Sequence, residues 1–218
     1  MAAPLRFPTL LGLFALLFAT VAELVLAQCS DVHVVYARGS TEAPGLGITG
    51  VHLVAGIKAN LPGKSVTSYA VVYGALIDQS SAGAGATDMT RHIVNYAASC
   101  PNAVFVIGGY SQGASVTDIA IGIRTLLGTG EVIPTSLAPR IKAVVTFGNP
   151  LRLFFQTIAT ASPLYATKSI DYCNLGDPVC NAGLVGPAHL TYHLDGSVTA
   201  AAYRAAVLVR AGTRNLRA

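Results

Sequence analysis

Short apolar segments alternate along this chain with stretches in which apolar residues recur every three or four positions. The first segment, Val32–Tyr36, is apolar apart from His33. In the stretch after it, apolar residues recur at every third position from Ile48 to Ile57, which is typical of one helix face. This pattern predicts strands at 32–36, 66–73, 103–107, 141–147 and 168–172, and helices at 48–59, 87–99, 114–127 and 197–211.

The predicted strands are apolar almost throughout and do not alternate between apolar and polar residues. Such strands are typical of a parallel sheet that is covered by helices on both faces, and strand–helix alternation favours parallel crossovers. We therefore predict an α/β fold, a three-layer α/β/α sandwich with a central five-stranded parallel sheet. Ligands in such folds bind beyond the carboxyl ends of the strands. Residues 28–218 fit one such domain and leave no room for a large cap domain.

The first 27 residues have the pattern of a secretory signal peptide. Arg6 is followed by an apolar run, and Val25 and Ala27 occupy the −3 and −1 positions of the expected cleavage site. An uncleaved anchor helix is the alternative, but Glu23 interrupts the run before about 18 apolar residues accumulate. No later segment is long and apolar enough to span a bilayer. We therefore predict that residues 28–218 are exported as a secreted, extracellular protein.

Charged residues make up only 11% of the 218 residues, whereas hydrophobic residues make up 52%. So few charges exclude a coiled coil and a charge-rich disordered protein. The net charge of +4 is mild and scattered, apart from a cluster at Arg210, Arg214 and Arg217. Because nucleic-acid-binding proteins concentrate Lys and Arg on one face, we expect no nucleic-acid partner. We interpret the basic tail as a solvated end, with a weak contact to an anionic surface as the alternative.

Four cysteines follow the predicted cleavage site. An even number in an exported protein indicates two disulfides, and four cysteines allow three pairings. No Cys-x2-Cys or Cys/His pair has zinc-ligand spacing, so we predict no metal site and no cofactor. Two of the cysteines enclose a short segment that contains Asp177, and a bridge between them would hold that aspartate still. The four are Cys29, Cys100, Cys173 and Cys180.

A Gly-x-Ser-x-Gly motif follows the third predicted strand and precedes a helix. In this context the motif forms a sharp turn that presents the Ser111 hydroxyl beyond the sheet. Gly109 and Gly113 lack a Cβ and let neighbouring backbone pass close. The Gln112 amide opens the helix, where unpaired donors and the helix dipole favour a developing oxyanion. A glycine-rich turn with an ordinary serine is the alternative, but the context favours a nucleophile.

A serine nucleophile needs a base and a carboxylate that orients the base. His189 and His193 follow the last predicted strand in a loop rich in Gly and Pro, and Asp177 precedes them. The order Ser, Asp, His is that of the α/β-hydrolases. Spacing alone does not choose between His189 and His193. The remaining histidines fall within predicted strands or helices, where packing or surface roles suit them: His33, His52 and His92.

Four segments of the chain carry distinctive motifs. Two of them are Gly-Tyr-Ser-Gln-Gly at 109–113 and Cys-Asn-x-Gly-Asp-x-Val-Cys at 173–180, and the others are Ala-Arg-Gly-Ser-Thr-Glu at 37–42 and His-Leu-x-Tyr at 189–192. In this combination the chain resembles the cutinase family. The first two motifs carry most of the resemblance, and the other two extend it over essentially the whole exported chain. The nearest resemblance is to the secreted cutinase-like proteins of actinobacteria.

The resemblance implies an α/β-hydrolase fold and a role for each matching residue. Ser111 is expected to be the nucleophile, Asp177 the acid and His189 the base. Ser40 and Gln112 are expected to form the oxyanion hole. His193 is an additional histidine that the family pattern does not require, and we interpret it as a loop residue. The implied disulfides are Cys29–Cys100 and Cys173–Cys180.

Together, the residues and the resemblance predict a secreted serine esterase that hydrolyses carboxylic ester bonds of lipids or polyesters through an acyl-enzyme. Leu184, Val185 and Leu190 flank the expected base and are predicted to contact substrate. Acetylxylan esterases resemble the same family, so deacetylation of a polysaccharide is an alternative. Acyl transfer to another alcohol, as in mycolyltransferases, is a second alternative, and a non-catalytic secreted surface protein is a third. We expect a monomer with an ester substrate and a peripheral contact with the cell wall or a lipid surface.

Overall fold

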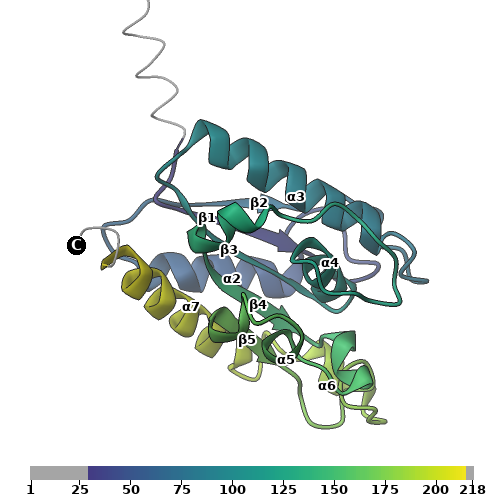
Figure 1. The fold of residues 1–218 in the computed structure, drawn as a ribbon. Coiled ribbons are helices and arrows are strands. Elements are labelled where there is room, and N and C mark those ends of the chain that lie inside the picture. Colours follow the sequence, from purple (N-terminus) through teal and green to yellow (C-terminus); the bar gives the residue numbers. More distant parts are fainter. Residues whose placement is uncertain (1–28, 215–218) are drawn as a thin grey trace, which may run out of the picture.

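A five-stranded, wholly parallel sheet runs through the centre of the computed structural model, which describes residues 29–214 (Figure 1). The strand order is β2-β1-β3-β4-β5. The predicted signal peptide, 1–27, lies outside the described residues, and so does Arg217 of the basic tail. The strands are β1 (Val32–Ala37), β2 (Val66–Ala70), β3 (Val104–Tyr110), β4 (Ile141–Phe147) and β5 (Ser169–Tyr172).

Two helices cover each face of the sheet, and Figure 1 shows the two pairs on opposite sides of it. One pair is α2 (Gly47–Ala59) with α7 (Ser197–Arg214), and the other is α3 (Ala82–Ser99) with α4 (Gln112–Ala120). The predicted three-layer sandwich is confirmed. The short elements are η1 (Thr135–Arg140), η2 (Pro150–Phe154), α5 (Ile158–Ala161), η3 (Ala166–Lys168) and α6 (Gly186–Leu190).

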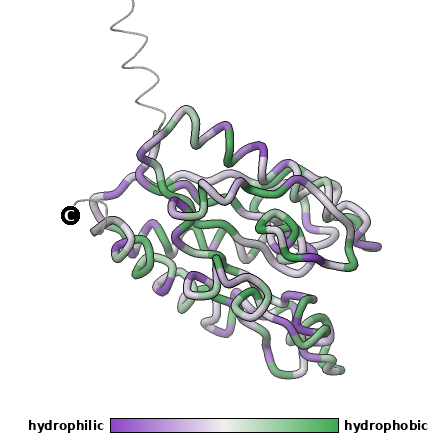
Figure 2. The backbone as a smooth tube through the Cα atoms, viewed as in Figure 1, coloured by the Kyte–Doolittle hydropathy of each residue, from purple (hydrophilic) through white to green (hydrophobic). Residues whose placement is uncertain are grey.

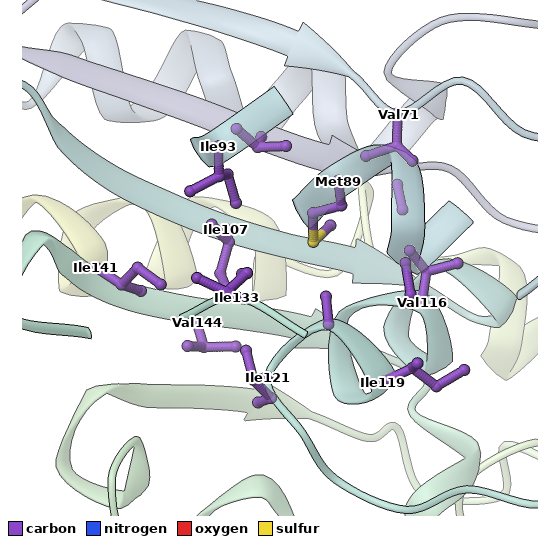
Figure 3. Close-up of a cluster of buried hydrophobic side chains, with 14 of the residues drawn as sticks. Val71, Met89, Ile93, Ile107, Val116, Ile119, Ile121, Ile133, Ile141 and Val144 are labelled. Atoms are coloured by element: carbon purple, nitrogen blue, oxygen red, sulfur yellow. The ribbon is translucent and has the colours of Figure 1, made fainter. Parts of the chain in front are cut away.

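The sheet separates two hydrophobic cores because successive residues of a strand point to opposite faces. Val34 and Val106 belong to the core beneath α2 and α7, whereas Val35 and Ile107 belong to the core beneath α3 and α4. Figure 3 shows the latter core, in which Ile107 lies among side chains of α3 and α4. In Figure 2 the outer helices alternate between hydrophilic and hydrophobic positions, as expected of helices with one buried face.

Helix α3 begins at Ala82, whereas the sequence pattern predicts a start at residue 87. The added turn is rich in glycine, a residue that weakens helices by about 1 kcal/mol relative to alanine. Packing explains the glycines here. A Cβ on Gly83 would lie 2.1 Å from the carbonyl oxygen of Thr129, and one on Gly85 would lie 2.7 Å from Val116. Tertiary contact therefore outweighs the low helix propensity of this segment.

Helix α4 ends at Ala120, and the prediction that it continues to residue 127 is wrong. The chain turns at Gly122, which has a positive φ of 83° that favours glycine. Ile121 and Ile123 on either side remain buried in the core beneath α3 and α4. The apolar pattern therefore predicted the burial of Ile123 correctly, although the backbone there is not helical.

Two predicted strand ends also differ from the structure by three residues each. The second strand ends at Ala70 and not at residue 73, and the third continues from residue 107 to Tyr110. The extension matters for the site because it joins β3 directly to the turn at Ser111. The register pairs Tyr110 with Phe147, so β3 and β4 end side by side.

Both disulfides implied by the resemblance are present. The Cys29–Cys100 bridge ties the beginning of the described chain to the end of α3. The Cys173–Cys180 bridge closes a loop directly after β5, at the carboxyl edge of the sheet. The second bridge therefore constrains the segment in which the predicted acid lies.

The basic tail is only partly described. Arg210 is half-buried and donates a hydrogen bond of 2.6 Å to the carbonyl oxygen of Asn60, at the end of α2. The interpretation of this residue as part of a solvated end is therefore wrong. Between residues 29 and 214, no helix is both long and apolar enough to cross a membrane.

Candidate active site

The turn between β3 and α4 holds Ser111 in a strained conformation. Its φ of 56° and ψ of −120° are outside the regions that residues with side chains favour. The flanking glycines make the turn possible. A Cβ on Gly109 would lie 2.0 Å from the carbonyl oxygen of Gly113, and one on Gly113 would lie 2.0 Å from that of Ala37. The Gly-x-Ser-x-Gly spacing is thus a steric requirement of this turn.

A continuous chain of hydrogen bonds joins Ser111, His189 and Asp177. The Nε2 atom of His189 lies 2.9 Å from the Ser111 Oγ, and its Nδ1 lies 2.8 Å from the Asp177 Oδ2. Because an ionised carboxylate only accepts hydrogen bonds, Nδ1 is the protonated nitrogen and Nε2 accepts from the serine hydroxyl. The structure therefore brings together all three residues that the resemblance assigned as nucleophile, acid and base.

Asp177 is fully buried, and its carboxylate accepts hydrogen bonds from three donors. Oδ2 accepts from His189 and from the Tyr192 hydroxyl at 2.5 Å, and Oδ1 accepts from the Val179 amide at 2.7 Å. Burial alone raises the pKa of Asp177, but these hydrogen bonds together outweigh it and leave the pKa below its ordinary value. The carboxylate is therefore ionised at neutral pH.

Tyr192 is a residue of the site to which neither the residue pattern nor the resemblance assigned a role of its own. Its side chain is fully buried, and its hydroxyl accepts a hydrogen bond of 3.0 Å from the Asn174 amide while donating to Asp177. Burial and the neighbouring carboxylate raise the pKa of Tyr192, so the hydroxyl stays protonated and can donate. The signal in the sequence was its place in the His-Leu-x-Tyr segment at 189–192.

Two further contacts hold His189, one at its backbone and one at its imidazole. The Tyr110 hydroxyl donates a hydrogen bond of 2.8 Å to the carbonyl oxygen of His189. On the other side, Gly148 directly follows β4 with a φ of 58°. A Cβ on Gly148 would lie 2.7 Å from the His189 Cε1 and 3.3 Å from the Asp177 Oδ2. Glycine at 148 is therefore required both by the backbone and by the imidazole packed against it.

The two predicted oxyanion-hole residues lie next to each other. The Ser40 hydroxyl donates a hydrogen bond of 3.4 Å to the Gln112 side-chain oxygen. The Gln112 amide opens α4, so no carbonyl within the helix accepts from it. The loop that carries Ser40 is held by Glu42, whose carboxylate accepts from the Gly39 amide at 2.6 Å. Buried Arg38 donates to the backbone of the same loop at the Glu42 carbonyl, 2.8 Å away.

Comparison with known proteins agrees with this geometry. A family model described as Cutinase matches residues 28–208. The chain belongs to the cutinase family. A cutinase from Kineococcus radiotolerans is 54% identical over 187 residues, which are 85% of this chain and 64% of that protein. The chain thus spans slightly less than two thirds of that relative.

This chain spans a larger share of two other similar proteins. Carboxylesterase Culp1 from Mycobacterium tuberculosis is 38% identical over 185 residues, which are 82% of this chain and 81% of that protein. The solved catalytic core domain of an acetyl xylan esterase from Trichoderma reesei is 25% identical, with a TM-score of 0.68. That alignment covers 85% of this chain and 100% of the solved domain. The three-layer fold is therefore shared with solved esterases.

The residues predicted to contact substrate are exposed on the segment that carries His189. Leu184 and Val185 precede α6 and are 98% and 52% exposed, and Leu190 at its end is 63% exposed. This segment is anchored to the Asp177 loop, because the Val185 amide donates a hydrogen bond of 3.0 Å to the Gly176 carbonyl. A contact between these side chains and a substrate remains a prediction.

The other histidines of this cutinase-family chain lie apart from the hydrogen-bonded chain. His193 is in the turn after α6, with its ring centroid 5.8 Å from that of exposed His52. His33 and His92 pack together, with their Nε2 atoms 2.8 Å apart. The structure therefore favours His189 over His193 as the partner of Ser111. In the described part of the chain, no group of three or more His, Cys, Asp or Glu side chains could hold a metal ion.

Proposed function

We propose that this protein is a secreted serine esterase that hydrolyses carboxylic ester bonds of lipids or polyesters. The observation that carries the proposal is the hydrogen-bond chain from the Ser111 hydroxyl through His189 to the Asp177 carboxylate. Membership of the cutinase family and similarity to a carboxylesterase support an ester as the substrate. The two disulfides support export, because such bridges persist in oxidising compartments.

In the first half of the reaction, the Ser111 Oγ attacks the carbonyl carbon of the ester while His189 Nε2 takes the hydroxyl proton. The Asp177 carboxylate stabilises the imidazolium and keeps the ring in the tautomer that accepts this proton. The tetrahedral intermediate collapses when His189 gives the proton to the departing alcohol. The products of this half are the free alcohol and an acyl group bonded to Ser111.

In the second half, His189 takes a proton from a water molecule, which attacks the acyl-enzyme. Collapse of the second intermediate returns the proton to the Ser111 Oγ and releases the carboxylic acid. In both halves a negative charge develops on the former carbonyl oxygen. We assign its stabilisation to the amide of Gln112 and to the backbone or hydroxyl of Ser40, and the loss of one such donor typically costs 10²–10³-fold in kcat.

The exposed apolar side chains beside His189 favour lipid or polyester substrates over soluble ones. Leu184, Val185 and Leu190 can cover part of an acyl chain as the ester reaches Ser111. Burial of apolar area is worth about 25 cal/mol per Å². Substrates with chains of several carbons should therefore be preferred to acetate esters. The protein is proposed to act as a monomer at a lipid or cell-wall surface.

A second candidate function is the removal of acetyl groups from a polysaccharide. The similarity to a solved acetyl xylan esterase domain favours it, because the two chains share the fold over that whole domain. The proposed chemistry at Ser111 is the same, and only the acyl and alcohol parts of the substrate differ. Acyl-chain preference therefore separates the two candidates.

The test is hydrolysis of p-nitrophenyl esters from acetate to palmitate by the purified secreted protein. We expect turnover that is highest between butyrate and octanoate and that falls by about 10³–10⁶-fold in Ser111→Ala. Ser99→Ala is the matched control, because Ser99 is exposed at the end of α3 and should leave the rates unchanged.

Each other result has a definite meaning. Activity confined to acetate would favour the deacetylase, and a sugar-acyl product in place of free acid would favour acyl transfer. More than a tenth of the activity in Ser111→Ala would exclude Ser111 as the nucleophile. No turnover by folded, disulfide-bonded protein would favour a non-catalytic surface protein.

A further inference from the structure

A cavity of about 230 Å³ lies between the segment that follows α4 and the η2 segment that follows β4. Its wall is mainly apolar, and none of Ser111, Asp177 and His189 lines it. Ser115, one helical turn beyond Ser111 on α4, also lines it. The cavity is therefore a neighbour of the proposed catalytic site and is distinct from it. The apolar wall is formed by Leu126, Leu127, Pro150, Leu151 and Phe154.

Arg124 is the charged residue that lines this cavity, and no aspartate or glutamate lines it. The side chain is exposed, and within residues 29–214 it has neither an ion pair nor a hydrogen bond. Two other arginines of the chain differ in this respect. Arg152 pairs with Asp171 at 2.8 Å, and Arg91 pairs with Glu131. An unpaired guanidinium beside an apolar cavity is complementary to an anion that carries a hydrocarbon chain.

The volume of the cavity limits what that chain can be. An apolar cavity of about 150 Å³ in another protein holds one benzene molecule, so 230 Å³ has room for one chain of about six to eight carbons. It has no room for the two acyl chains of a phospholipid. A carboxylate is the anion that the planar guanidinium fork matches with two parallel hydrogen bonds.

We propose that this cavity is a binding site for a medium-chain fatty acid, with the alkyl chain against the Leu127 and Leu151 side and the carboxylate on Arg124. The site is separate from the proposed catalytic residues and does not require them to be active. If the proposed function is correct, the fatty acid bound in this cavity is of the same class as the acid that the reaction releases. The site would then retain a product beside the place where it forms.

The test is titration calorimetry of sodium octanoate into the Ser111→Ala variant, in which no ester chemistry can interfere. We expect one octanoate per chain, with affinity that rises about fourfold for each methylene from butyrate to octanoate. Arg124→Gln should weaken octanoate binding at least about tenfold. Arg204→Gln, on the exposed side of α7, is the matched control and should leave it unchanged.

A second arm separates this cavity from the proposed catalytic groove. Wild-type protein whose Ser111 has been phosphorylated with diethyl p-nitrophenyl phosphate should bind octanoate as Ser111→Ala does. Loss of binding in the phosphorylated protein would place the ligand in the catalytic groove and overturn the proposal. Absence of saturable binding, or equal weakening by Arg124→Gln and Arg204→Gln, would overturn it as well. Failure of the esterase assay would leave the calorimetric test intact, because that test uses the Ser111→Ala variant.

Discussion

Replacement of Tyr192 by phenylalanine removes one of the three donors to the Asp177 carboxylate. The lost hydrogen bond is buried, 2.5 Å long and made to a charged group. Hydrogen bonds of this class contribute about 1.5–3 kcal/mol. The Asn174 amide also loses its acceptor, at 3.0 Å. We therefore expect the free energy of unfolding to fall by about 2–3 kcal/mol at pH 7 and Tm to fall by about 4–12 °C.

The pH dependence of this loss follows from the charge on Asp177. The pKa of the folded carboxylate lies below the ordinary value of 3.8, so its stabilising contribution is present above that pH and is lost as the pH falls below it. The difference in unfolding free energy between wild type and Tyr192→Phe should accordingly shrink in acid. Urea unfolding at several pH values measures it.

The same substitution should change the proposed reaction. Without the tyrosine, fewer donors share the carboxylate charge, and that charge attracts the proton on His189 more strongly. The acid limb of the kcat/KM profile should therefore move to higher pH. The maximum of kcat/KM should fall by about tenfold, because the remaining donors still position Asp177.

The control is Tyr36→Phe. Tyr36 is also fully buried, but its hydroxyl bonds to the neutral Thr49 hydroxyl at 3.0 Å. That variant should lose about 1 kcal/mol and keep the wild-type pH profile. Equal stability losses and superimposable pH profiles in the two variants would refute the role assigned to Tyr192.

Two further predictions use matched pairs of variants. Gly148→Ala places a Cβ 2.7 Å from the His189 ring and should lower kcat/KM by at least about 10²-fold. Its control is Gly63→Ala, which is also at a positive φ but has no atom within 4 Å of the added Cβ and should leave kcat/KM unchanged. An equal effect of both would show that backbone strain alone matters. Burial lowers the pKa of His33 to about 4. Between pH 6.5 and 4 the unfolded chain therefore binds more protons than the folded one, and the free energy of unfolding decreases as the pH is lowered through that range. His33→Phe should remove about 2–3 kcal/mol of that decrease, measured by urea unfolding at several pH values. The exposed-site control is His52→Phe. If the unfolding free energy of His33→Phe changed with pH as steeply as that of His52→Phe, the prediction would be contradicted.

The central layers of the fold could be predicted because apolar patterning reports burial directly. The prediction was wrong at α4, where buried Ile123 continues the helical spacing of Ile119 and Ala120 although Gly122 turns the chain. Periodicity alone cannot distinguish a helix from a turn that buries the same side chains. The early start of α3 could not be predicted either. Glycine is required at position 83 because the Thr129 backbone packs against it. That contact joins segments far apart in the sequence.

The site was predictable where local sequence determines local geometry. Ser111 stands in a turn whose glycines are sterically required, and Asp177 lies within a short disulfide loop. The choice between His189 and His193 needed either the family resemblance or the structure, because four residues of spacing do not reveal which ring reaches the serine. Tyr192 and Gly148 could not be assigned a role from the residues alone. Each acts through a contact between segments that the fold brings together.

The most direct test of the central claim is mass analysis of the secreted protein after reaction with diethyl p-nitrophenyl phosphate, with peptide mapping of the modified residue. We expect one diethyl phosphoryl group per chain, carried by Ser111, and loss of ester turnover in proportion to its incorporation. Modification of a different residue, or full turnover by protein that carries the group on Ser111, would contradict the account.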